Sequence, residues 1–146
     1  MLDGAAIEFL GSAATLKLTL LSRPYSDDPD FIRASVVLEA HEFHGEFEAG
    51  TWSWELRALR QVLAALDRQV GRPTQEEFSF LDARVSLIFE LTKQGHILIH
   101  GKVERGAPPD WTHLEFIISS DQTFLPVWMR AVDQALAQFP PGRSEA

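Results

Sequence analysis

A stretch of regularly spaced apolar residues between positions 52 and 70 constrains the fold more than any other part of the chain. Spacings of four and three residues place these side chains on one side of an α-helix, with charged and amide side chains on the other. A helix over this range is about 28 Å long, so a wide apolar surface must cover its stripe. The stripe consists of Trp52, Leu56, Leu59, Leu63, Leu66 and Val70.

The rest of the chain is dominated by strand-like alternation of apolar and polar residues. We expect strands over 5–10, 14–22, 32–40, 78–91 (interrupted at Asp82), 96–104 and 111–119. Near His41 the alternation slips, so that Phe43 and Phe47 take the inward positions. A bulge or a tight turn over 40–42 explains the slip, and residues 32–49 then form either one bent strand or a hairpin.

A second amphipathic helix is predicted over residues 121–139, with Pro126 in its first turn, where the missing N–H has no cost. The first helix is expected to start at Thr51 or Ser53 as N-cap and to end near Gly71. The sequence therefore predicts an α+β fold, with a single antiparallel sheet of five to seven strands and two amphipathic helices packed on one face. We expect one domain over residues 1–140 and a flexible tail over 141–146.

Composition narrows the functional classes. The formal charge of −8 argues against nucleic acid as a partner, because phosphate binding requires clustered Lys and Arg. The chain contains no cysteine, which excludes disulfides and thiolate metal sites. No apolar run approaches the ~20 residues of a membrane span, and the first residues lack the pattern of a signal peptide. We expect a cytoplasmic protein that does not bind membranes.

The histidines do not have the spacing of a metal site. His41 and His44 are three residues apart in a strand or turn, where such residues point to opposite faces. His96 and His100 share a face, but four strand residues place them ~13 Å apart, too far for one zinc ion. We predict no metal and no cofactor.

No arrangement of residues typical of catalysis is present in the sequence. Glu90, Glu104 and Glu115 take outward strand positions, whereas a catalytic carboxyl must be desolvated or coupled to another. No serine lies in a nucleophile elbow, and no Gly-rich loop resembles a phosphate site. The prediction is a protein without enzymatic activity.

An acidic segment is the first candidate binding surface. Residues 34–54 contain no Lys or Arg. Such a segment either prevents aggregation at a sheet edge or docks a basic partner, with electrostatic attraction speeding the encounter. Its acidic residues are Glu39, Glu42, Glu46 and Glu48.

A set of outward apolar residues is the second candidate. Val37, Ile88, Leu98 and Ile117 fall out of phase with the core residues, one on each of four strands. On neighbouring strands they would form a stripe that binds a partner or a second copy of the chain; a covering loop or the N-terminal strands could instead bury them. Trp54 and Trp111 are either partner anchors or part of the core or its rim.

Four segments occur in an order that resembles a known protein family. They are residues 30–36 (DFIRASV), 47–56 (FEAGTWSWEL), 95–99 (GHILI) and 119–126 (SSDQTFLP). Together they resemble the WapI-type immunity proteins of bacteria, over about residues 25–136, most sharply at 121–126. The resemblance implies a non-enzymatic protein that binds and inhibits a toxin delivered between competing bacteria, and it assigns no active-site residues.

These observations predict a binding protein that blocks a toxin domain by direct contact. An acidic inhibitor suits a toxin that acts on nucleic acid, because such toxins are usually basic. The alternative is a small-ligand or regulatory module in which the sheet and helices enclose a pocket.

Overall fold

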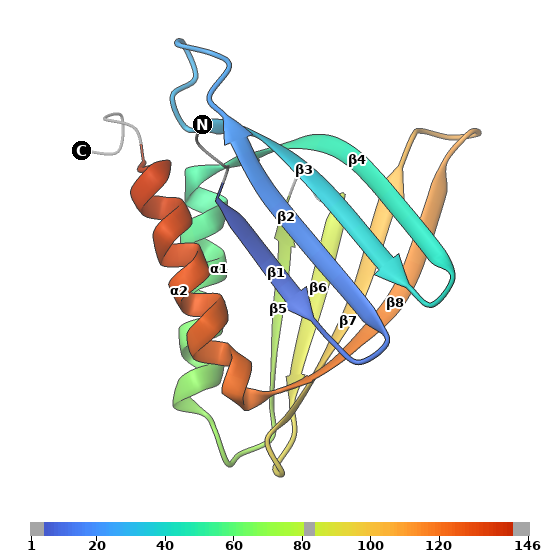
Figure 1. Ribbon diagram of the computed structural model, residues 1–146, viewed down its shortest axis with the longest axis vertical. Coiled ribbons are helices and arrows are strands. Elements are labelled where there is room, and N and C mark those ends of the chain that lie inside the picture. The colour runs from blue at the N-terminus through green and yellow to red at the C-terminus, as the bar shows by residue number, and fades with distance from the viewer. Residues whose placement is uncertain (1–4, 81–83, 142–146) are drawn as a thin grey trace.

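The computed structural model describes residues 5–80 and 84–141, which form eight β-strands, two α-helices and one short 3-10 helix. The strands build two four-stranded antiparallel sheets, with the orders β1–β2–β3–β4 and β5–β6–β7–β8. The two sheets face each other, and the helices lie side by side along one side of them (Figure 1). In chain order the elements are β1 (Ala6–Leu10), β2 (Ala14–Ser22), β3 (Phe31–Ala40), β4 (Phe43–Trp52), α1 (Ser53–Arg68), β5 (Thr74–Phe80), β6 (Val85–Leu91), β7 (His96–Arg105), β8 (Thr112–Asp121), η1 (Gln122–Phe124) and α2 (Leu125–Gln138).

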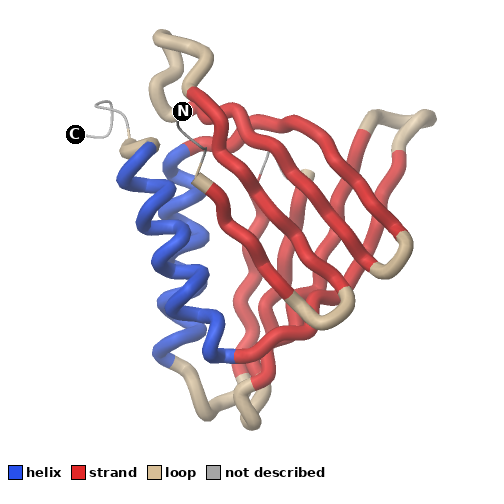
Figure 2. Tube along the Cα trace, in the orientation of Figure 1, coloured by secondary structure: helices blue, strands red, loops and turns tan. Residues whose placement is uncertain are grey.

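The prediction of an α+β fold with antiparallel strands and two helices is confirmed, but the prediction of a single sheet is wrong. Each sheet has one apolar face, and these two faces largely cover each other. The helices therefore do not have to cover a whole sheet face. They close one side of the sandwich, where α1 contacts the edge strand β5 and α2 contacts the edge strand β1 (Figures 1 and 2).

Three predictions fall wholly or partly outside the described residues. The expected interruption of a strand at Asp82 is one of them, and the start of the expected domain, over residues 1–4, is another. Of the expected tail at 141–146, only Pro141 is described, and it has no regular secondary structure.

Helix α1 buries most of the predicted apolar stripe. Leu56, Leu59, Leu63 and Leu66 are at most 1% exposed, whereas Val70 lies beyond the end of the helix and is 42% exposed. The four leucines repeat with the helical period and meet the core, while Val70 is no longer held on that face because the helix ends at Arg68.

Replacing Leu63 with alanine is expected to lower the free energy of unfolding by about 2 to 5 kcal/mol, because the change leaves a cavity in the core. Val70→Ala, in the exposed part of the same predicted stripe, should change it by less than about 0.5 kcal/mol. Urea denaturation of both variants measures the difference. Equal losses would contradict the placement of Leu63 in the core.

The start of α1 differs from the prediction. The N-cap is Trp52, not Thr51 or Ser53. The Trp52 backbone N–H donates to the Glu55 carboxylate over 3.4 Å, and the buried Thr51 hydroxyl donates to the same oxygen over 2.7 Å. A carboxylate three residues into a helix satisfies N–H groups that the helix leaves free, which explains the burial of Glu55.

A two-residue turn resolves the alternatives for residues 32–49. Ala40 pairs with Phe43, and His41 between them has a φ of +56°, so β3 and β4 form a hairpin. The turn shifts the phase of the alternation, and the inward placement of Phe43 and Phe47 is confirmed. Gly95 in the β6–β7 turn has a φ of +92°, a conformation that glycine adopts without a steric cost.

Helix α2 starts later than expected. Residues 122–124 form the 3-10 helix η1, and Pro126 lies in the first turn of α2, as predicted. The Asp121 carboxylate accepts hydrogen bonds from the hydroxyl and, at 2.7 Å, the backbone N–H of Thr123. These bonds, with a smaller contribution from His96, hold the pKa of Asp121 below its usual 3.8.

The lowered pKa of Asp121 predicts a pH-dependent contribution to stability. The ionised carboxylate stabilises the fold above the unfolded-state pKa of about 4, and this contribution is lost as the pH falls through the lower folded-state pKa. Asp121→Ala should lower the melting temperature at neutral pH, and its difference from the wild type should shrink below about pH 4. Asp121→Asn, which keeps an acceptor without the charge, should retain more of the stability at neutral pH. If the difference in melting temperature between Asp121→Ala and the wild type did not change with pH, this role would be contradicted.

Candidate partner-binding surface

The side of the sandwich opposite the helices is open. The first sheet ends there at β4 and the second sheet ends at β8. The β3–β4 hairpin and the start of β8 lie away from the helices in Figure 1. Near the end of β8 the sheets are joined, because the Ser12 backbone N–H donates to the Ser119 carbonyl over 3.2 Å. Toward the β3–β4 hairpin they separate and leave a groove of about 570 Å³.

We call this space the edge groove. Its walls come from both sheets: the β3–β4 hairpin provides one, and the end of β7 with the start of β8 provides the other. His44, Glu46 and His113 also line it. Arg105 adds one cation to the lining. The apolar residues of the lining are Leu38, Phe43, Phe47, Val103 and Leu114.

Inward side chains of β4 make the groove apolar and leave a gap in it. Phe43, Gly45 and Phe47 are successive inward residues, and Phe43 is 65% exposed. Gly45 has no side chain, and nothing lies within 4 Å of the position that a Cβ would occupy. The Arg105 guanidinium lies 4.4 Å from the centre of the Phe47 ring, within the range of a cation–π contact.

The structure gathers three of the predicted acidic residues on the outer face of the first sheet. Glu39 lies on β3, Glu46 and Glu48 lie on β4, and all three pair with neighbours on that face. Glu42 lies in the exposed turn between the two strands. The acidic segment therefore borders the edge groove along the outer side of β4.

Local partners of these carboxylates are exposed to solvent. Glu48 is 3.2 Å from the Arg33 guanidinium, while His44 lies 3.3 Å from Glu39 and 3.7 Å from Glu46. The carboxylates in these contacts are about 60% exposed, so each pair contributes little to stability. Their negative charge remains available to a partner.

The predicted four-residue apolar stripe is wrong. Val37 lies on the outer face of the first sheet, beside Lys17 and Glu46. The other three residues lie on the outer face of the second sheet, which points the opposite way. There Ile88 and Ile117 flank His100, and Leu98 pairs with Glu90 and Ser119. Alternation identifies the face of a strand but not its sheet, which is why these four residues seemed to belong together.

The two tryptophans considered as partner anchors are exposed. Trp54, 54% exposed, stacks on Trp52 at the start of α1, outside the edge groove. Trp111, 51% exposed, lies 6.1 Å from His113, which lines the groove. Trp111 is thus the tryptophan beside the candidate surface.

The outward placement of the carboxylates considered for catalysis is confirmed. Glu90 lies 3.0 Å from His100, and Glu115 lies 3.6 Å from His113. Glu104 pairs with His113 on the same outer face. Within residues 5–80 and 84–141, no three His, Asp or Glu side chains are grouped as a metal site requires.

Two features of this surface were not anticipated from the sequence. The pairing of Phe47 with Arg105 joins residues from different sheets, and no periodic pattern relates them. The gap at Gly45 has a weak signal, since a glycine interrupts the inward aromatic residues of an alternating strand.

Comparisons with known proteins agree with the resemblance found in the sequence. The model of the immunity protein WapI-like family matches residues 8–140, a range that includes the segment 121–126. No curated protein sequence matches the chain. Within the described residues, no helix combines the length and apolarity needed to cross a membrane. Because the family model matches most of its length, the chain belongs to the immunity protein WapI-like family.

Proposed function

We propose that this protein neutralises a bacterial toxin domain by binding it directly, without catalysis, and that the edge groove with its acidic border is the contact surface. The observation that carries the proposal is an exposed apolar groove at a sheet edge, bordered by acidic side chains, in a member of an immunity protein family. Exposed apolar surface rimmed by polar residues is typical of protein interaction sites.

The two parts of the surface would act at different stages of binding. Glu42, Glu46 and Glu48 would attract a basic toxin surface and raise the association rate. Burial of the exposed ring of Phe43 would then slow dissociation, because buried aromatic anchors provide much of the binding free energy. A toxin that acts on nucleic acid has the basic surface that this arrangement requires.

Growth rescue tests the proposed function. Co-expression with the toxin encoded beside this chain should restore growth, and the two proteins should elute as one complex in size-exclusion chromatography. Absence of both rescue and a complex would exclude neutralisation of that toxin.

Removing the exposed ring in the groove should separate binding from stability. Phe43→Ala should weaken toxin binding by about 30-fold, as expected for an interface anchor worth ~2 kcal/mol, with little change in stability because the ring is 65% exposed. Val127→Ala, at a 49% exposed position on α2, is the matched control and should bind normally. Calorimetric titration of both variants measures the effect, and equal affinities would place the contact surface elsewhere.

A small-ligand module is the second candidate function. The edge groove has a volume within the usual range of ligand pockets, and its lining is mostly apolar. A ligand that binds the native state raises the melting temperature, so a thermal-shift screen of apolar compounds tests this function. A reproducible shift that Gly45→Leu abolishes would favour it.

A further inference from the structure

We propose that the edge groove receives an extended segment of the partner, which adds to β4 as a new strand with apolar side chains facing inward and basic side chains facing outward. This inference rests on the proposed function and specifies which element of the partner is recognised.

The edge of β4 is suited to strand addition. The four sheet edges are β1, β4, β5 and β8. The helices contact β1 and β5, and α1 also contacts β4, which leads directly into it at Trp52. Strand β8 bonds to Ser12 near its end. Strand β4 has ten residues, and in the described part of the chain its ladder bonds run to β3. Its opposite side can therefore offer a long row of N–H and C=O groups to an incoming strand.

The side chains of β4 specify the alternation of that strand. Inward residues Phe43 and Phe47 border the groove, whereas outward residues Glu46 and Glu48 carry negative charge. Directly opposite side chains on paired strands lie about 4.5 to 5.5 Å apart, where opposite charges stabilise the pair. A strand added here would place its apolar side chains beside the two rings and its Lys or Arg side chains beside the two carboxylates.

Two further features fix the direction of this alternation. The open space at Gly45 lies between the inward aromatic residues and can accept an apolar side chain. The Arg105 guanidinium puts a positive charge beside Phe47 on the inner side, so a basic side chain is disfavoured there. Basic residues of the segment are therefore expected only on its outer side.

Charge also argues against a second copy of this chain as the occupant. Pairing of two β4 edges would bring Glu42, Glu46 and Glu48 of one copy beside the same acidic strand of the other. Like charges on directly opposite strand positions are destabilising. A basic strand from a different protein fits this edge better than a symmetric dimer.

A titration with short model peptides tests the inference without the toxin. The probe is a blocked peptide of four Val-Lys repeats, and a peptide of four Val-Glu repeats is its control. We expect saturable changes in the NMR chemical shifts of the backbone amides along β4, centred on Gly45. They should occur with the Val-Lys peptide and not with the Val-Glu peptide. No saturable shift up to millimolar peptide, equal shifts with both peptides, or shifts centred outside β4 would overturn the inference.

Two variants make the titration specific. Gly45→Leu places a side chain in the gap, where an added Cβ has no atom within 4 Å, and should weaken Val-Lys binding by about 10-fold or more. Ser79→Leu, at an exposed strand position outside the groove, should not. The double variant Glu46→Lys with Glu48→Lys should reverse the preference toward Val-Glu and gives a second test if Gly45→Leu does not fold. Unchanged binding by Gly45→Leu, or an unchanged preference of the charge-reversed protein, would contradict strand addition at β4.

Light scattering on the wild-type protein should show a monomer. A dimer broken by the charge reversal on β4 would identify a second copy as the occupant and overturn the inference. Because the peptide titration does not use the toxin, it can fail while growth rescue succeeds, and the reverse is equally distinguishable.

Discussion

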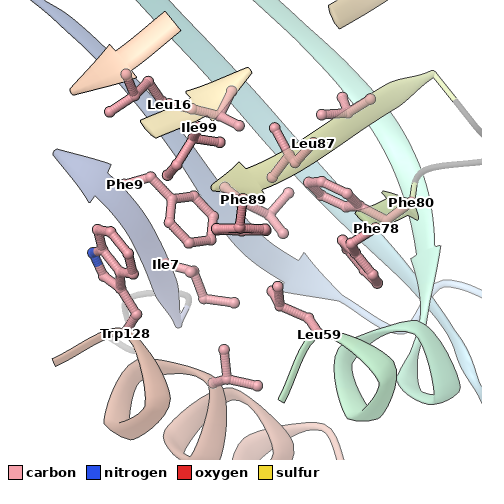
Figure 3. Close-up of a cluster of buried hydrophobic side chains, with 14 of the residues drawn as sticks. Ile7, Phe9, Leu16, Leu59, Phe78, Phe80, Leu87, Phe89, Ile99 and Trp128 are labelled. Carbon is pink, nitrogen blue, oxygen red and sulfur yellow. The ribbon is translucent and has the colours of Figure 1, made fainter. Parts of the chain in front are cut away.

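Phe9→Ala is expected to lower the free energy of unfolding by about 3 to 5 kcal/mol, among the largest losses available to a single substitution in this fold. Phe9 is 1% exposed and joins three parts of the core. Its ring lies 5.8 Å from Phe89 in the second sheet and 5.2 Å from Trp128 in α2, both in edge-to-face geometry (Figure 3). Truncation would remove burial and two aromatic contacts at once.

Leu10→Ala is the matched control for this prediction. Leu10 is the next residue on β1, points to the opposite face and is 46% exposed. Its truncation should change the free energy of unfolding by less than about 0.5 kcal/mol. Because small domains have a total stability of about 5 to 15 kcal/mol, the Phe9 variant should show a much lower urea midpoint. Similar midpoints for the two variants would mean that β1 does not join the helices to both sheets.

Reversing the charge of Glu46 and Glu48 is expected to slow association with a basic toxin by about 10-fold or more at low salt. Both carboxylates are exposed, and the Glu48 pair with Arg33 is a surface pair, so the fold should lose little stability. The rate should depend less on salt in the variant than in the wild type, because screening acts on the attraction that the variant lacks. Stopped-flow measurements at low and high salt give both quantities.

A second double reversal separates local docking from net charge. Glu77→Lys with Glu90→Lys changes the net charge by the same amount on the outer face of the second sheet. This control should slow association much less than the β4 variant. Equal slowing would show that only overall charge matters, and an unchanged rate for the β4 variant would exclude its acidic border from the encounter.

Local elements of the fold were predictable because they depend on periodicity. The four leucines of α1 repeat every three or four residues, and their burial followed from that spacing alone. Alternation likewise predicted most strands and the inward placement of Phe43 and Phe47. Strand β5 begins at Thr74, before the expected start at residue 78. Its first residues, including Gln75 and Glu76, are polar at an edge of the sheet and show no apolar alternation.

Relations between distant elements were not predictable in the same way. Val37 and Ile117 have the same outward phase, yet they lie on opposite outer faces, because alternation does not assign a strand to a sheet. The edge groove exists because the two sheets separate near the β3–β4 hairpin, which no local pattern records. The burial of Glu55 also required the structure, since the sequence shows its position in a helix but not the Thr51 hydroxyl above it.

Of the candidate site, the sequence identified the acidic border and the structure supplied the apolar part. Glu46 and Glu48 were identified by the absence of cations over residues 34–54. The exposure of Phe43 and the gap at Gly45 depend on how far the opposing sheet lies from β4, which is a tertiary property. The combined surface therefore differs from both predicted surfaces: it lies at the edge of β4, between the two sheets.

Hydrogen exchange on the complex with the toxin encoded beside this chain tests direct binding at this edge most directly. Amides of residues 43–50 should become protected when the toxin binds, because their outer side would pair with the partner or be shielded from water. The outer face of the second sheet, including Ile88 and Leu98, should exchange as in the free protein. Protection confined to that outer face or to the helices, with residues 43–50 unchanged, would contradict binding at the β4 edge.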